Sequence, residues 1–209
     1  MKTEKTTITI SPPNFKHLKL KLRGTAPLMQ AKFSAKTKQA MMEKMALGSV
    51  TKKGIKKKAR NFDDDFEQAI HYSTDGWIGV PAASIRNACI DVCRMVGFKM
   101  THAKMSVFIL ADGNDSSDGQ PLIKLISNKP PERTEMAVRN ASGVTDIRIR
   151  PMWRQWELAV TIKFDADQFQ PSDIVNLIAR AGVQIGICEG RPYSKSSNGL
   201  GYGTFEIVT

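Results

Sequence analysis

Residues 182–205 read GVQIGICEGRPYSKSSNGLGYGTF, and six of these positions are glycine: 182, 186, 190, 199, 201 and 203. An apolar run (Val183, Ile185, Ile187) leads into the stretch and Phe205 leads out of it, which predicts two strands flanking a long glycine-rich loop. Glycines allow positive φ and close backbone approach. With cations beside it, such a loop suits phosphate groups, although a hairpin loop whose glycines only satisfy turn geometry remains open.

Several familiar sites are excluded by their motifs. The loop contains neither the GxxxxGK[ST] phosphate-binding motif nor a GxGxxG between a strand and a helix. The three cysteines, Cys89, Cys93 and Cys188, form no CxxC pair, so we expect reduced core residues and neither a metal nor a cofactor. The stretch DGNDSSDG at 112–119 is typical of a turn and lacks the closing glutamate of a calcium loop.

Length and charge limit the class of protein. With 209 residues and 41% hydrophobic residues, the chain is long enough for one domain with a proper core. Its 31 Lys and Arg exceed its 20 Asp and Glu, and the formal net charge of +11 indicates a polyanionic partner, usually a nucleic acid. No apolar run is long enough to cross a membrane, and MKTEKTTITISPP resembles no secretory signal, so we expect a cytoplasmic protein without a membrane partner.

Most of the excess charge falls between residues 35 and 62, where nine basic residues accompany one acid, Glu43. We interpret residues 35–66 as a flexible basic insertion, partly helical at MMEKMAL, that orders on a polyanion. A charged loop that is merely solvated is the alternative. Asp63, Asp64 and Asp65 follow abruptly. They favour the first turn of a short helix, where carboxylates complement the helix dipole, over a metal or phosphodiester-cleaving site.

Periodicity predicts the regular elements on either side of the insertion. The alternation at 17–23 indicates a half-buried strand with a cationic outer face. Apolar positions 85, 88, 89, 92, 93 and 96 predict a helix that begins at 82–84 and ends before Gly97. Further strands are predicted at 105–110, 122–126, 146–151 and 156–164, a loop at 129–142, and a second helix at 167–182 with Ile174, Leu177, Ile178 and Ala181 buried.

The element order therefore predicts an α+β protein. When the insertion and one hairpin are set aside, the order is βαββαβ, which is the ferredoxin-like or RRM-like arrangement. All 209 residues would form one domain. The first turn of the first helix carries Ser84, Arg86 and Asn87, where unpaired N–H groups attract anions.

Two stretches resemble one family. The phrase VPAASIRNACIDVCRMVG at 80–97 resembles the first-helix motif of the RAMP superfamily, the ferredoxin-like RNA-binding subunits of CRISPR systems. The C-terminal GICEGRPYSKSSNGLGYGTFEI resembles that family's glycine-rich loop and last strand. The family's guide-coating backbone subunits carry an insertion after strand one, as this chain does. The chain departs from the family in the polar stretch 191–198 and in its short length, which is compatible with a stand-alone or phage-borne relative.

The resemblance and the charge together imply a non-enzymatic protein that binds the backbone of single-stranded RNA, assembles as copies along the strand and joins other CRISPR-type subunits. Tyr193 and Tyr202 would stack on bases, as Trp153 or Trp156 could if exposed. The predicted nucleic-acid contacts are Lys52, Lys53, Lys56, Lys57, Lys58, Arg60, Ser84, Arg86, Asn87, Arg148, Arg150, Arg154, Gly190, Arg191, Tyr193, Lys195, Gly199, Gly201 and Tyr202.

Three alternatives remain. Some relatives in the family cleave RNA, and His71 or one of Asp63 to Asp65 would be the candidate acid or base here. A single-stranded DNA-binding or annealing protein has the same charge pattern, because the 2′-OH contact that distinguishes RNA depends on geometry. A protein that imitates a CRISPR subunit is the third.

Overall fold

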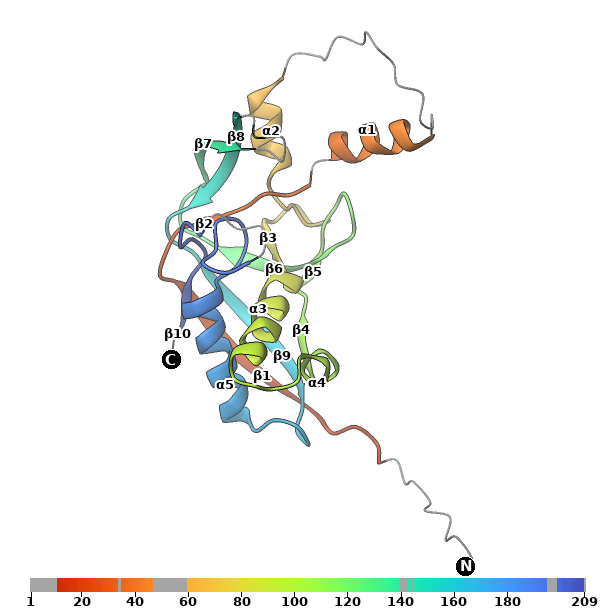
Figure 1. The fold of residues 1–209 in the computed structure, drawn as a ribbon, viewed down its shortest axis with the longest axis vertical. Helices are drawn as coiled ribbons and strands as arrows, with labels where there is room; N and C mark the ends of the chain where they lie inside the picture. The colour runs from red at the N-terminus through yellow and green to blue at the C-terminus, as the bar shows by residue number, and fades with distance from the viewer. Residues whose placement is uncertain are drawn as a thin grey trace, which may run out of the picture.

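The computed structural model describes residues 11–33, 35–46, 60–139, 143, 145–194 and 199–208, in which two antiparallel sheets are combined with helices (Figure 1). The prediction of an α+β fold is confirmed. The larger sheet is curled and has seven strands: β1 (Phe15–Gly24), β3 (Gly79–Pro81), β4 (Val107–Leu110), β5 (Gly113–Asn114), β6 (Pro121–Ile126), β9 (Glu157–Asp165) and β10 (Phe205–Val208).

β1 and β9 form the middle of this sheet. They pair along their whole length, with Leu20 opposite Val160 and Leu22 opposite Leu158. Strand order is β10-β1-β9-β6-β3, and β4 pairs with the part of β9 that β6 leaves open. Leu22 is buried and the basic residues of β1 are exposed, so the predicted half-buried strand with a cationic outer face is confirmed.

The smaller sheet has the order β2 (Leu28–Met29), β8 (Thr145–Trp153) and β7 (Glu132–Arg139). The prediction of a loop over 129–142 is therefore wrong for eight of its residues. β7 reads ERTEMAVR, which contains too few apolar residues to indicate a strand by itself. It becomes a strand because β8 offers it a full register, from Glu132 opposite Met152 to Arg139 opposite Thr145.

Two amphipathic helices, α3 (Ala82–Met95) and α5 (Pro171–Arg180), pack against each other beside the larger sheet (Figure 1). Ile85, Ala88, Cys89, Val92 and Cys93 of α3 are buried, as their helical spacing predicts. Val96 is half exposed because the helix ends at residue 95, so its predicted burial is wrong. All four apolar residues predicted for the second helix, at positions 174, 177, 178 and 181, are buried.

The chain between α5 and the glycine loop is not a strand. Residues Ala181–Ile185 form a π-helical turn, η1, whose Val183 is exposed while Ile185 is buried. The predicted strand at 183–187 is therefore wrong: the chain there forms a π-helical turn in contact with β10. A Cβ at Gly182 would overlap the carbonyl oxygen of Phe205. The second predicted flank is confirmed as β10.

Helices also bound the basic insertion. α1 (Ala35–Ala46) covers most of MMEKMAL, and α2 (Phe62–Gln68) follows residues 47–59, which lie outside the described residues. The interpretation of Asp63 to Asp65 as first-turn carboxylates is confirmed, since α2 begins after Asn61, whose side chain accepts hydrogen bonds from two of their backbone N–H groups. A further helix, α4 (Met100–Ser106), takes Met105 out of the strand predicted at 105–110.

A four-stranded ferredoxin-like sheet is not evident as such, because β3, β5 and β6 extend the larger sheet and the second sheet lies beside it. Among the described residues, no helix has the length and apolar character needed to cross a membrane.

We predict that Gly203 is the least replaceable glycine of the loop. Its φ is +66°, and a Cβ there would overlap the carbonyl oxygen of Ile187, whose own N–H donates to the Gly203 carbonyl at 3.0 Å. Gly203→Ala should therefore lose about 3 kcal/mol or more of unfolding free energy. Gly201→Ala is the control, because Gly201 has φ +79° but no atom within 4 Å of the added Cβ, so only about 1–2 kcal/mol is expected. Equal losses in urea denaturation would contradict the close approach.

Candidate functional site

A cavity of about 650 Å³ lies where the glycine-rich loop meets the start of α3 and the β7–β8 hairpin. Its lining includes four of the predicted contact residues, namely Ser84, Arg148, Gly190 and Arg191. The loop and the first turn of α3 are about a hundred residues apart in sequence, so the fold brings them together. The remaining lining residues are Gln30, Ala31, His71, Pro81, Ala137, Val138, Cys188, Glu189 and Ser194.

The start of α3 faces this cavity through Pro81 and Ser84. Pro81 is the N-cap and supplies no side-chain hydrogen bond to the first turn. Backbone N–H groups at an uncapped helix start are donors that suit anions or water. The Ser84 hydroxyl hydrogen-bonds to the sulfur of Cys188, and burial raises the pKa of that thiol to about 12. Cys188 is therefore an uncharged part of the wall.

Two guanidinium groups enter the same wall from different elements. Arg148 comes from β8, and its Nε lies 4.0 Å from Oδ2 of Asp146, a distance at the limit of an ion pair. Arg191 comes from the glycine loop and donates from Nη1 to the carbonyl oxygen of Cys188 at 2.8 Å. Guanidinium groups bind phosphate through several donors at once, so the pair suits a polyanionic backbone.

Arg150 has a different role. Its Nε donates to Oε2 of Glu189 at 2.5 Å, and the Arg150 side chain is only 16% exposed. The backbone N–H of Glu189 in turn donates to the carbonyl of Met29 at 3.0 Å. Arg150 thus ties β8 to the glycine loop, and its charge is balanced before any ligand arrives.

His71, which lines the cavity, belongs to a buried network that the sequence does not reveal. His71 is 7% exposed, and its Nδ1 lies 2.8 Å from Oδ2 of Asp115. The other carboxylate oxygen of Asp115 accepts from Nζ of Lys32 at 2.6 Å and from the backbone and hydroxyl of Ser117. Gln30 completes the support, since its Oε1 accepts from the His71 backbone and its Nε2 donates to the Gly79 carbonyl.

The charges of this network follow from its partners. Burial alone would raise the pKa of Asp115, but hydrogen bonds from Lys32, Ser117 and His71 hold that pKa well below its usual range. Burial lowers the pKa of His71 below its ordinary value and outweighs the hydrogen bond to Asp115, which raises it. At neutral pH the Asp115 side chain is therefore a carboxylate and the His71 ring is neutral. An ionised acceptor at Nδ1 requires that nitrogen to carry the imidazole proton.

Arg86 does not reach the cavity. Its Nε donates to the carbonyl of Val107 at 3.0 Å, its Nη2 donates to the carbonyl of Lys104, and its guanidinium lies 5.3 Å from the centre of the Phe108 ring. These intramolecular contacts explain why an arginine occupies the first turn of α3, and no bound anion is needed to explain it. Asn87 beside it is exposed and is not part of the cavity lining.

Other predicted contacts are engaged elsewhere. Arg60 pairs with Asp65 and Asp146, and Arg154 donates to both carboxylate oxygens of Glu132. The Tyr193 hydroxyl accepts from Arg94 at 3.3 Å. None of these side chains lines the cavity.

The aromatic residues divide into two groups. Trp153 and Trp156 are each 2% exposed, so a base-stacking role for them is wrong. Tyr202 is half buried beside Gly190, where an added Cβ would lie 2.8 Å from the tyrosine ring.

The remaining predicted contacts are glycines and lysines. Two glycines, Gly199 and Gly201, have positive φ, as turn geometry requires, but do not line the cavity. Six predicted lysines lie outside the described residues: Lys52, Lys53, Lys56, Lys57, Lys58 and Lys195.

The described part of the chain contains no group of three or more His, Cys, Asp or Glu placed to hold a metal ion. Cys89 and Cys93 are buried free thiols, as predicted. A scan against protein-family models and a search of curated proteins each found no match to this chain. Function must therefore be inferred from the chemistry of the cavity.

We predict that the His71 network makes stability depend on pH. In the unfolded chain the imidazole has a pKa of about 6.5, and in the folded chain the pKa is lower. Between the two values the unfolded state binds more protons, so the free energy of unfolding should decrease as the pH falls below about 6.5. Urea denaturation from pH 8 to 5 measures this. The His71→Phe variant should lose that part of the decrease, and the exposed-site control His17→Gln should keep it.

Proposed function

We propose that this chain is a non-enzymatic RNA-binding protein that holds the backbone of a single-stranded RNA in the cavity between the glycine loop and α3. The observation that carries the proposal is the convergence of Arg148, Arg191 and the uncapped start of α3 on one cavity. Each supplies donors for phosphate oxygens, and they come from three distant parts of the sequence. Contacts of this kind confer affinity without reading base sequence.

The fold assignment within the proposal is a ferredoxin-like core of the RAMP superfamily. Four strands and two helices, taken in the order β1-α3-β4-β9-α5-β10, support it. β10, β1, β9 and β4 are neighbours in that order, and every pairing is antiparallel. β4 therefore runs parallel to β1, with α3 between them in sequence, and β10 runs parallel to β9, with α5 between them. This is the connectivity of two interleaved βαβ units.

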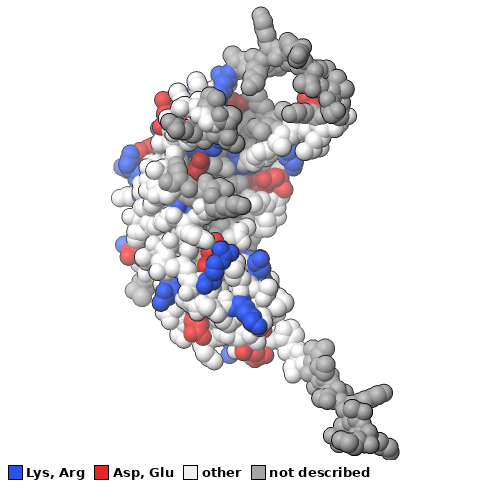
Figure 2. All heavy atoms as spheres, in the orientation of Figure 1, with Lys and Arg blue, Asp and Glu red and all other residues white. Residues whose placement is uncertain are grey.

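The basic insertion would extend the RNA-binding surface. On the face that Figure 2 shows, Lys and Arg are interspersed with Asp and Glu, so this face offers no uniform cationic surface. Five lysines fall between residues 47 and 59, in one short stretch without an acid. These lysines would neutralise further phosphates of a bound strand.

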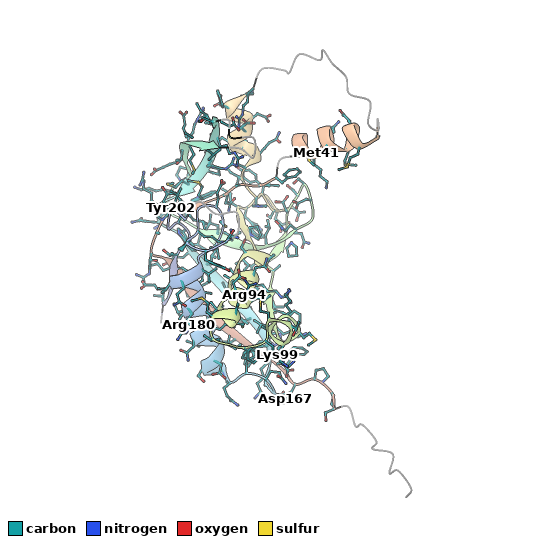
Figure 3. The ribbon with its side chains drawn as sticks, viewed as in Figure 1. Met41, Arg94, Lys99, Asp167, Arg180 and Tyr202 are labelled. Atoms are coloured by element: carbon teal, nitrogen blue, oxygen red, sulfur yellow. The ribbon has the colours of Figure 1, made fainter. Side chains whose placement is uncertain are left out.

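The proposal also includes assembly: copies of this chain would bind side by side along the RNA strand and would join other CRISPR-type subunits. α1 lies apart from both sheets and exposes Met41, Met42 and Met45, by 46%, 61% and 73% (Figures 1 and 3). Methionine-rich helix faces adapt to apolar partners. A neighbouring copy on the same RNA strand would be such a partner.

We predict that affinity for single-stranded RNA depends on salt through the cavity arginines. The wild-type log–log slope should become less steep by about 0.7 for each phosphate contact removed, hence by about 1.4 in the Arg148→Ala/Arg191→Ala double variant. Arg23→Ala/Arg180→Ala removes the same charge from exposed positions on β1 and α5, outside the cavity lining, and should leave the slope unchanged. Figure 3 labels Arg180 on α5. Fluorescence anisotropy with a labelled U12 oligonucleotide between 50 and 300 mM salt measures both. Equal changes in the two variants would mean that binding is diffuse rather than centred on the cavity.

One observation favours a second candidate, an endoribonuclease. Neutral His71, oriented by Asp115, has the arrangement of a general base, and two guanidinium groups share its cavity. Such a base would take the proton from a ribose 2′-OH, whose oxygen would attack the neighbouring phosphorus as the 5′-oxygen leaves. No second group is seen among the described residues at the cavity in a position to protonate that leaving oxygen, which favours binding without cleavage.

We therefore predict that labelled U12 RNA remains intact after incubation with the protein at pH 7–8, with or without EDTA. A denaturing gel measures this. Fragments ending in a 2′,3′-cyclic phosphate that disappear with His71→Phe would favour the endoribonuclease instead. Fragments that persist with that variant would indicate a contaminating nuclease.

A further inference from the structure

The proposed RNA-binding cavity has one feature that phosphate binding does not explain. Phosphate oxygens only accept hydrogen bonds, so a phosphate site requires donors. The His71 side chain lines the cavity, yet its ring is neutral at pH 7 and its Nδ1–H is directed at Asp115. The other ring nitrogen, Nε2, is then a lone-pair acceptor, and it is not one of the buried side-chain atoms that lack a hydrogen-bond partner, so it keeps some access to solvent. Among the described residues no hydrogen-bond partner of Nε2 is found.

The surroundings keep this acceptor in place. Asp115 is held by Lys32 and Ser117, so it cannot turn away from the imidazole without losing a buried ion pair. The Lys32 side chain is also only 8% exposed, and its ammonium group forms an ion pair with Asp115. Two other side-chain acceptors at the cavity already have partners: Oε1 of Gln30 accepts from the His71 backbone, and Oε2 of Glu189 accepts from Arg150.

An acceptor on a residue that lines a ligand cavity favours a ligand group that donates a hydrogen bond. The sugar–phosphate backbone of RNA offers one donor per nucleotide, the ribose 2′-OH, and the backbone of DNA offers none. We propose that Nε2 of His71 accepts a hydrogen bond from a ribose 2′-OH, and that His71 is the residue by which this cavity distinguishes RNA from DNA. The inference rests on the proposed function: Arg148 and Arg191 bind phosphate at the wall while His71 reads the sugar.

The test uses oligonucleotides that differ only at the 2′ position: uridine, 2′-deoxyuridine and 2′-fluorouridine dodecamers. The 2′-fluoro sugar keeps the RNA-like pucker but has no donor, so it separates the hydrogen bond from sugar shape. Wild-type protein should bind the ribose strand about 3- to 10-fold more tightly than either analogue at pH 7.5, the value of one neutral hydrogen bond. Anisotropy with intact strands, verified on a denaturing gel, measures this.

The matched variants are His71→Phe, which keeps a planar ring without the acceptor, and Arg148→Ala. His71→Phe should bind the three strands equally, whereas Arg148→Ala should weaken all three by a similar factor and keep the preference for ribose. If wild-type protein binds the ribose and 2′-fluoro strands equally, the inference is wrong while the proposed function stands. If no strand binds at 50 mM salt, the proposed function fails and the inference with it. The comparison of the three strands with wild-type protein requires no substitution, so it tests the inference even if a variant fails to fold.

Discussion

The contacts of the Asp115 carboxylate join the cavity residue His71 to the chain that precedes the basic insertion. Asp115 is 2% exposed and would be strongly unfavourable without partners, but it receives Lys32, His71 and Ser117. Lys32 precedes the insertion and His71 follows it. The backbone of Lys32 also donates to the carbonyl of Ala69. The described residues on either side of the insertion are thereby joined through one buried carboxylate.

The opposite wall is held by backbone geometry rather than by charge. Gly203 brings the chain before β10 against Ile187, and the hydrogen bond from Gly203 N–H to the Pro27 carbonyl attaches both to the segment between β1 and β2. Arg150 then joins the loop to β8 through Glu189. A loop of positive-φ glycines would otherwise lose considerable conformational entropy on binding a ligand. Because the contacts of Gly203 and Glu189 already fix the two ends of the loop, less conformational entropy is lost when a ligand binds beside it.

Local pattern predicts those parts of this fold in which one face is buried. β1, β9, α3 and α5 follow from period two or period 3.6, and Ser84, Arg148, Gly190 and Arg191 were identified because a helix start, a cationic strand and a glycine loop are each visible locally. β7 and η1 cannot be predicted from local pattern. β7 forms because it pairs with β8, and η1 forms where Gly182 lies close to Phe205 of β10. Asp115 lies in a stretch typical of a turn, 44 residues from His71, and only the tertiary fold makes it the partner of that histidine.

The network also explains why the cavity is not a simple anion site. A cavity evolved only for phosphate would place its most buried cation at the floor, where low dielectric makes a charge most effective. Lys32 is a buried cation, but it pairs with Asp115 and does not line the cavity, whereas His71 does line it. The positive groups stand on the wall, in Arg148 and Arg191. The groups that attract a polyanion are thus different from the imidazole acceptor of His71. That division favours a ligand that alternates charge with a hydroxyl donor, as a ribose–phosphate backbone does, over an isolated anion.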